Sequence, residues 1–447
     1  MRVIQGIKNL SFVNFAITFL IIRFISIANS FPARIDSDSG SYTSGDGFTN
    51  WNWVSFSGSE FGRGWPSVLL FSLVSSNSGR IFILQIINLT AWIFFGFAGS
   101  AYLNRKNQTY FLYFLLFVGN SIAGQQWNNW IGRESFAFSL TLLATSLHLL
   151  WISRPNRKFL FLTLLFVSLY AVTKPSLIFI GLIQFLLIII RLYKKSGILS
   201  SKILSLVFVL AFSIYTLVNI GNQDQGWGNA DPTGRTTKEI AYTYLTSDFN
   251  PNSTELRNYF GKNGAPSCAI LNQPSTQNNL GGPMQHAAEL HSTCKGFSNW
   301  VNTSFYPRYF LYSLAHLDSV SELVGNQIQD AFTFTNNVSY FEILPSFQLK
   351  LIDYVTIAAF FYLIFLFSLN FKYLKNQKSF GVLTMLTVAS FTSILFSLLI
   401  QPTHPSDISR QNYVSSLMFR LLIVFMALIA KSNISNKNKG EYYFKIH

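Results

Sequence analysis

Long apolar runs separated by short polar or basic segments extend through most of the chain. A helix that rises about 1.5 Å per residue needs about 20 residues to cross a hydrocarbon core of about 30 Å. Ten runs approach that length, at residues 10–28, 81–103, 109–123, 134–152, 159–173, 176–190, 203–220, 351–369, 380–400 and 413–430. The pattern predicts an all-α polytopic membrane protein with about ten transmembrane helices.

Three of these runs, beginning at Thr109, Phe159 and Ser176, are short for a full crossing. Such helices either sit in a locally thinned bilayer or pack inside the bundle beside a water-filled cavity. The predicted number of spans is therefore good to about one helix.

The composition supports a membrane protein, since 50 % of the residues are apolar, 17 % are aromatic and only 11 % are charged. The net charge of +15 would also suit a nucleic-acid-binding protein. With the N-terminus in the cytoplasm, however, the cytoplasmic segments hold 18 Lys and Arg and one acid, Glu441. The remaining segments hold 15 bases and 17 acids. This asymmetry follows the positive-inside rule, so we expect both termini inside and no nucleic acid as partner.

Three regions follow from this topology. Residues 1–220 form an N-terminal transmembrane module with a first external loop at 29–80, and the first helix is interpreted as a retained anchor. Residues 221–350 form a small external domain between helices seven and eight, with amphipathic helices expected near 236–245 and 306–335. Residues 351–447 supply the last three helices and a cytoplasmic tail.

The two cysteines of the chain, Cys268 and Cys294, both lie in the external domain. An oxidising exterior permits a disulfide between them, which would contribute about 3 kcal/mol in the simplest chain-entropy model. His286 and His291 lack the close ligand pairs typical of a zinc site, so we interpret them as solvated loop residues.

The first external loop is the most informative part of the sequence. It carries Asp36, Asp38 and Asp46 close to the membrane surface, and Gly64-Trp65-Pro66 then leads into a short apolar helix. Carboxylates beside a membrane are costly to desolvate, which favours a role in binding or proton transfer. The alternative is that the acids only keep a polar loop soluble.

This arrangement resembles the GT-C superfamily of integral-membrane glycosyltransferases that use polyprenyl-phosphate sugars. The resemblance rests on four stretches: DSGSY at 38–42, Arg-x-x-Pro at 63–66, GRESFAFSLTLLATSLHLL at 132–150 and VTKPSLIF at 172–179. It covers about the first 180 residues. The later external segment matches no single member family.

The resemblance implies that an acidic residue of the first loop is the catalytic base, and we assign that role to Asp38. Asp36 would orient the sugar or the acceptor. In some members an Asp-x-Asp pair holds a divalent metal, so Mg²⁺ or Mn²⁺ at Asp36 is the alternative, and no cofactor is certain. Tyr42 and Arg63 belong to the matching motifs and are predicted to bind substrate.

A leaving phosphate needs cations, and three basic residues are predicted at external helix ends: Arg133, Lys174 and Arg410. The alternatives are snorkelling, or a surface ion pair between Arg133 and Glu134. Glu134 begins the fourth helix, where a carboxylate interacts well with the helix dipole; its other predicted role is to accept hydrogen bonds from sugar hydroxyls.

Four further residues have two interpretations each. Trp127 and Trp130 form an interfacial aromatic belt or stack on a sugar, and the belt is favoured. Arg23 lies within the first helix, where a charge normally faces a cavity, but it is close enough to the helix end to snorkel, and snorkelling is favoured. Arg420 lies deeper, where it either lines the cavity for the lipid phosphate or pairs with an acid on a neighbouring helix.

The sequence thus predicts an inverting glycosyltransferase of the bacterial inner membrane, working in the cell envelope with its active site on the periplasmic or extracellular face. Its partners would be a polyprenyl-phosphate sugar donor, a glycan, lipid or protein acceptor and the lipid bilayer. Two other classes remain: a polysaccharide polymerase, and a lipid-linked sugar flippase or transporter.

Overall fold

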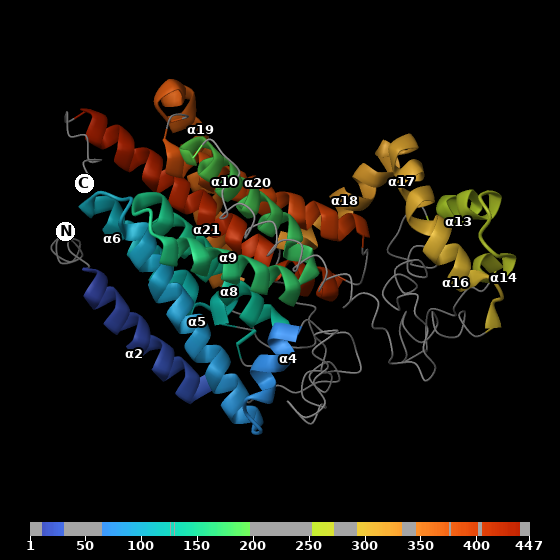
Figure 1. Ribbon diagram of the computed structural model, residues 1–447, viewed down its shortest axis with the longest axis horizontal. Coiled ribbons are helices and arrows are strands. Elements are labelled where there is room, and N and C mark those ends of the chain that lie inside the picture. Colours follow the sequence, from blue (N-terminus) through green and yellow to red (C-terminus); the bar gives the residue numbers. More distant parts are fainter. Residues whose placement is uncertain are drawn as a thin grey trace.

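The computed structural model describes residues 11–30, 65–125, 127–128, 130–196, 253–271, 293–332, 346–374, 377–400 and 405–438. Within these ranges the regular elements are helical, without strands (Figure 1). The helices are α2 (Phe12–Ser30), α4 (Trp65–Ser72), α5 (Asn77–Ser100), α6 (Arg105–Asn120), α7 (Ile122–Gln125), α8 (Arg133–Ser153), α9 (Arg157–Thr173), η2 (Pro175–Leu177), α10 (Ile178–Ser196), α13 (Ser253–Lys262), α14 (Ser267–Leu271), α16 (Phe297–Trp300), η3 (Val301–Phe305), α17 (Tyr306–Ala315), α18 (Leu317–Phe332), α19 (Ser346–Leu374), α20 (Lys378–Ile400) and α21 (Pro405–Asn438).

Five helices are long and apolar enough to cross a membrane: α5, α8, α19, α20 and α21. Shorter apolar helices occupy Phe12–Ile25 and Ile178–Tyr193. The two other short predicted runs correspond to α6 and α9, which pack against neighbouring helices of the same bundle. The run at 203–220 and the predicted helix near 236–245 lie outside the described residues. The helical, membrane-embedded class is thus supported, whereas ten spans remain a prediction.

The centre of the bundle is formed by α8 and α21. Within the most apolar stretch of each helix, 94 % of the α8 residues and 89 % of the α21 residues are buried. In α19 the share is only 17 %, and large side chains such as Tyr354 and Phe361 are exposed. An exposed apolar helix of this kind suits contact with lipid, whereas α8 and α21 fill the core.

Glycines let the first helices approach one another closely. A Cβ placed on Gly96 would lie 2.8 Å from the Phe15 ring, and one on Gly119 would lie 2.7 Å from the Phe19 ring. Both rings belong to α2, so glycines of α5 and α6 make room for its aromatic face. Small residues at helix contacts are typical of packing in a membrane.

Polar caps define where several helices begin. Asn104 and Asn156 accept hydrogen bonds from the backbone N–H groups of Asn107 and Lys158, at the starts of α6 and α9. An asparagine at this position satisfies a backbone donor that has no partner within the helix. Each cap follows a tight connection, so the short turns reverse the chain between antiparallel helices.

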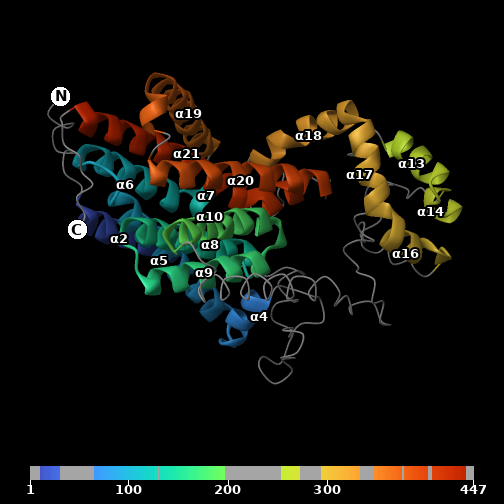
Figure 2. The same ribbon diagram turned by 45° about the horizontal axis from the view of Figure 1, so that its top comes forward.

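The bundle has two ends, which we name by what lies there. The terminal end is where α2 begins and α21 ends, and the distal end is where α8 begins and α9 ends (Figures 1 and 2). Exposed bases occupy the connections at the terminal end, namely Arg105, Lys106, Arg154, Arg157, Lys158 and Lys372. This distribution is the one the positive-inside rule describes for a cytoplasmic side.

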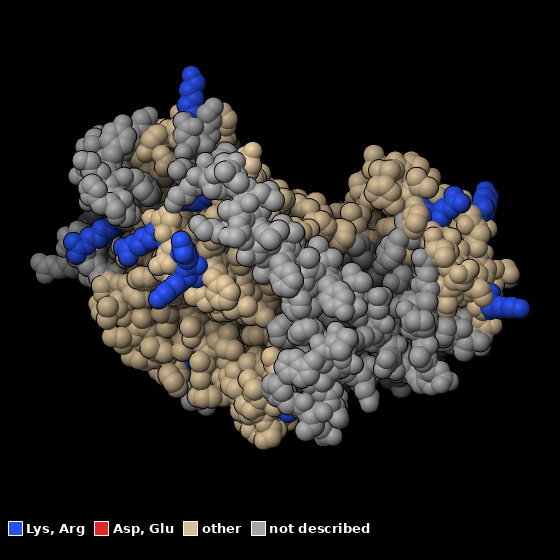
Figure 3. All heavy atoms as spheres, in the orientation of Figure 1, with Lys and Arg blue, Asp and Glu red and all other residues tan. Residues whose placement is uncertain are grey.

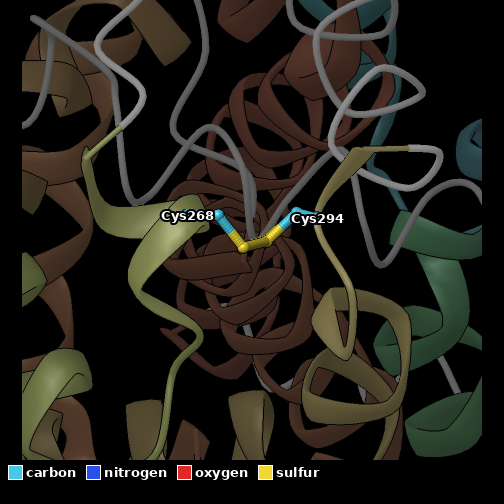
Figure 4. The surroundings of a disulfide bond; sticks show 2 residues. All are labelled: Cys268 and Cys294. Carbon is cyan, nitrogen blue, oxygen red and sulfur yellow. A yellow bond between two sulfur atoms is a disulfide. The ribbon is translucent and has the colours of Figure 1, made fainter.

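A small module with its own core stands beside the bundle. We call it the disulfide module; its described part comprises residues 253–271 and 293–315, with α13, α14, α16, η3 and α17. Its core includes Phe260, Phe297 and Trp300, all buried. The predicted bond between Cys268 and Cys294 is confirmed, with an S–S distance of 2.06 Å (Figure 4).

The predicted amphipathic stretch at 306–335 forms two helices, α17 and α18, divided at His316. Near its C-terminal end α18 packs against the bundle, where Ala331 meets Ile394 and Leu398 of α20. Leu323, in the first half of α18, belongs to the core of the disulfide module together with Tyr309 and Tyr312 of α17, so α18 connects the module to the bundle.

Candidate functional site

Four charged residues meet at the distal end of the bundle, and we call them the distal cluster: Arg133, Glu134, Lys174 and Arg410. Arg133 and Glu134 open α8, Lys174 directly follows α9, and Arg410 lies in the second turn of α21. The cluster therefore brings together residues from three helices, all of them predicted from the sequence to bind substrate.

An ion pair between Lys174 and Glu134 forms the centre of the distal cluster. Lys174 Nζ lies 3.7 Å from Glu134 Oε1, and both side chains are almost fully buried, at 2 % and 4 % exposed. Lys174 Nζ also donates a hydrogen bond of 3.0 Å to the backbone carbonyl of Arg410. The predicted ion-pair partner of Glu134 was the neighbouring base Arg133, but among the described residues Glu134 pairs with Lys174.

The second carboxylate oxygen, Glu134 Oε2, is buried and accepts no hydrogen bond from the described residues. Most buried polar atoms have a partner, and a buried acceptor without one is costly. The nearby Ser176 Oγ is also buried without a hydrogen bond. Glu134 Oε2 therefore has unused capacity to accept a hydrogen bond from a hydroxyl or N–H donor.

The cluster carries three bases and one acid. Arg133 and Arg410 both lie close enough to act electrostatically on Lys174. The attraction between these bases and an anion is stronger where water is partly excluded. The predominantly positive charge thus suits a phosphate group, as the sequence predicted for these three bases.

Aromatic rings lie against the cluster. The guanidinium of Arg410 lies 5.6 Å from the centre of the Trp130 ring, and Trp127 is 5.1 Å from Trp130 between ring centres. Tyr413 packs on Trp127 at 5.9 Å. Trp127 and Trp130 are each only 2 % exposed, so the favoured prediction of an interfacial belt is wrong. The Trp127 and Trp130 rings pack inside the protein, and the Trp130 ring contacts the Arg410 guanidinium.

Arg23 does not snorkel, and that prediction is also wrong. Its side chain is 1 % exposed and points into the bundle. Its two terminal nitrogens donate to Gln85 Oε1 at 3.4 Å, to Asn88 Oδ1 at 3.2 Å and to the Gly119 carbonyl at 2.7 Å. Arg23 therefore ties α2 to α5 and α6 with neutral acceptors.

The hydrogen bonds of Arg23 continue toward the distal cluster. Asn88 Oδ1 also accepts from Asn128 Nδ2 at 3.1 Å, and Asn88 Nδ2 donates to Ser139 Oγ at 3.1 Å. Ser135 Oγ donates to Asn128 Oδ1, and Ser135 is the neighbour of Glu134. This polar network was missed from the sequence; its local signs were Gln85 and Asn88 within an apolar run.

Arg420 lies away from the distal cluster. It follows Arg410 by ten residues on α21, which is about 15 Å along a helix. Its Nε and Nη2 donate to Asp353 Oδ1 at 2.9 and 2.7 Å, and Nη2 also donates to the carbonyl of Phe332. Of the two alternatives predicted for Arg420, the ion pair with an acid on a neighbouring helix is the one observed.

Four of the predicted site residues lie outside the described residues: Asp36, Asp38, Tyr42 and Arg63. Their roles remain predictions. The described ranges contain no group of three or more His, Cys, Asp or Glu residues suited to a metal ion. Comparisons of the chain with protein-family models, with curated proteins and with solved structures find no match.

Proposed function

We propose that the protein transfers a sugar from a polyprenyl-phosphate donor to an acceptor glycan, lipid or protein. In this proposal the distal end faces the periplasm or the cell exterior, and the terminal end faces the cytoplasm. About ten spans place both termini inside, with the disulfide module following the seventh span. The exposed bases at the terminal end support this orientation.

The observation that carries the proposal is the composition of the distal cluster. Three bases and one acid, separated by up to 277 positions in the sequence, meet at one end of the bundle. They offer positive charge for a phosphate and, in Glu134 Oε2, one buried acceptor without a hydrogen bond. A sugar phosphate presents both complementary groups, an anion and hydroxyl donors.

In the proposed reaction the acceptor hydroxyl attacks the anomeric carbon, and the polyprenyl phosphate leaves. Asp38 takes the proton of the acceptor hydroxyl as general base. Lys174, Arg133 and Arg410 stabilise the negative charge of the leaving phosphate. Glu134 accepts a hydrogen bond from a sugar hydroxyl and so orients the donor.

Asp36, Tyr42 and Arg63 complete the proposed site around the first loop. Asp36 orients the sugar or the acceptor, or holds Mg²⁺ or Mn²⁺ as the alternative. No step of the proposed reaction depends on the metal.

The test is transfer from a labelled polyprenyl-phosphate hexose by the purified, reconstituted protein. We expect Asp38→Ala to abolish transfer while the protein inserts and expresses normally, because the acceptor hydroxyl keeps its proton. Asp46→Ala is the matched control, since it removes another acid of the same loop. Full activity of Asp38→Ala would remove Asp38 from the mechanism.

The same preparation distinguishes the two other classes. A protein that transfers no sugar, but moves a lipid-linked sugar across the vesicle membrane, would be a flippase. A protein that extends a glycan chain from lipid-linked repeat units would be a polymerase. Either result would refute the proposed transferase.

A further inference from the structure

Helix α17 of the disulfide module has two apolar faces, and only one of them is covered. Tyr309 and Tyr312 point into the module core, where they are 9 % and 3 % exposed. On the other side, three large apolar residues of α17 are more than half exposed, Phe310 at 63 %, Leu311 at 52 % and Leu314 at 56 %, and Leu317, the first residue of α18, is exposed at 65 %. We call these four residues the α17 apolar face.

Helix α17 is packed firmly against the core of the disulfide module, so the exposure of its other side does not come from poor packing of the helix. The buried side of α17 is held by aromatic contacts, with Tyr259 at 5.1 Å from Tyr312 and Phe305 at 6.1 Å from Tyr309. The disulfide closes the same module. The apolar side chains are therefore presented by a fixed helix.

The α17 apolar face is also concentrated. Among the described side chains of residues 253–271 and 293–317, these four are the large apolar ones more than a third exposed. Single exposed apolar residues are common, but a contiguous group marks a surface that contacts a partner or a membrane. Phe310, Leu311 and Leu314 lie on one side of α17, opposite Tyr309 and Tyr312, and Leu317 follows directly after the break at His316.

The charge of the module suits a phospholipid surface. Its described part, residues 253–271 and 293–315, contains four bases, Arg257, Lys262, Lys295 and Arg308, and one acid, Glu255. In Figure 3 a group of Lys and Arg side chains lies at the right of the molecule, over the module, with no Asp or Glu of the described residues visible on that face. Basic side chains beside an apolar helix face are typical of helices that lie in a membrane interface.

The connection to the bundle keeps the module near the bilayer. The last turns of α18 pack against Ile394 and Leu398, within the last two turns of the span Ser379–Leu399. α18 has 16 residues, which is about 24 Å of helix. It runs at an oblique angle to α20, and the module lies off the distal end of the bundle in both views (Figures 1 and 2). The module thus stands beside the distal end of the spans.

From these observations we propose that the α17 apolar face inserts into the lipid leaflet at the distal end of the bundle. Phe310, Leu311, Leu314 and Leu317 would enter the boundary between head groups and acyl chains, and the surrounding bases would contact lipid phosphates. Interfacial helices bury their apolar face by about 5–10 Å in this region. The proposal concerns the surface of the module and does not depend on the reaction at the distal cluster.

Site-directed spin labelling of the full-length protein tests this insertion. Both native cysteines are in the disulfide, so a single introduced cysteine can be labelled. Leu314→Cys carries the label on the α17 apolar face, and Asn299→Cys, an exposed polar position of the same module, is the control. Both are reconstituted in vesicles of phosphatidylcholine and phosphatidylglycerol, and collisions with oxygen and with a water-soluble nickel chelate are measured.

We expect the label at 314 to collide with oxygen more often than with the nickel chelate, at a depth of about 5–10 Å. The label at 299 should show the opposite preference. Adding Phe310→Asn and Leu311→Asn to Leu314→Cys should return its label to water. These substitutions are at exposed positions, so the module should keep its fold and its disulfide.

Two results would overturn the proposal. Equal access of the nickel chelate to the labels at 314 and 299 would place the apolar face in water. A strong dipolar coupling between labels at 314 of two copies, without contact with doxyl-labelled lipid, would instead assign the face to a contact between copies of the chain.

Discussion

The ion pair of Arg420 and Asp353 predicts an asymmetric response to mutation. The Arg420 side chain is 3 % exposed, whereas that of Asp353 is 38 % exposed. Removing Asp353 leaves a buried cation without its carboxylate, but removing Arg420 leaves an acid that water can reach. Breaking a buried pair costs most when the remaining charge stays buried.

The expected magnitudes follow from what each variant leaves behind. Asp353→Ala removes both hydrogen bonds to Oδ1 and leaves Arg420 with the carbonyls of Phe332 and Ser416. We expect a loss of about 3–5 kcal/mol in the free energy of unfolding. Arg420→Met leaves a hydrated Asp353 and the Phe332 carbonyl, so we expect a loss of about 1–3 kcal/mol.

The assay is reversible unfolding of the purified protein in mixed detergent micelles, with both single variants and the double variant. Because the two residues interact directly, the double variant should lose less than the sum of the single losses. Glu322→Ala, at an exposed position of α18, is the control and should change stability by less than about 0.5 kcal/mol. A larger loss for Arg420→Met than for Asp353→Ala, or strict additivity, would refute the reasoning.

Three further predictions concern the distal cluster, the disulfide and the metal. Lys174→Met should raise the apparent KM for a polyprenyl-phosphate hexose about ten- to hundredfold, and Lys174→Arg should recover part of that loss, because a charged hydrogen bond contributes about 1.5–3 kcal/mol; an unchanged KM in steady-state transfer would contradict phosphate binding there. Replacing Cys268 and Cys294 by serine should destabilise the disulfide module by about 3 kcal/mol, measured by protease sensitivity of the module, whereas the bundle should resist protease as before. EDTA should leave transfer unchanged if Asp36 is not a metal ligand, and a loss that Mg²⁺ or Mn²⁺ restores would assign it that role.

The helices and the disulfide could be predicted because their signals are local. An apolar run of sufficient length specifies a helix, and the runs at 81–103 and 134–152 correspond to α5 and α8. The disulfide could be predicted because the two cysteines are only 26 residues apart and lie in the same predicted external segment. Neither prediction depends on which helix packs against which.

The environments of the charged residues could not be predicted in the same way. The acceptors of Arg23 lie 62, 65 and 96 residues away along the chain, so its burial depends on how α2 packs on α5 and α6. The same holds for Glu134, because the adjacent Arg133 suggested a local pair but Lys174 approaches from another helix. Sequence identifies the charges, whereas their partners follow from helix packing.

Packing also explains how Glu134 can keep an oxygen without a hydrogen bond. Lys174 holds one carboxylate oxygen, and the neighbouring Ser135 is fixed through Asn128 to Asn88 and Arg23. The start of α8 is thus positioned by the protein itself and does not require a ligand to order it. A buried acceptor without a donor costs about 1–3 kcal/mol of stability. A ligand hydroxyl that donates a hydrogen bond to Glu134 Oε2 would remove this penalty. The fold therefore favours binding of a hydroxyl donor at this oxygen of the distal cluster.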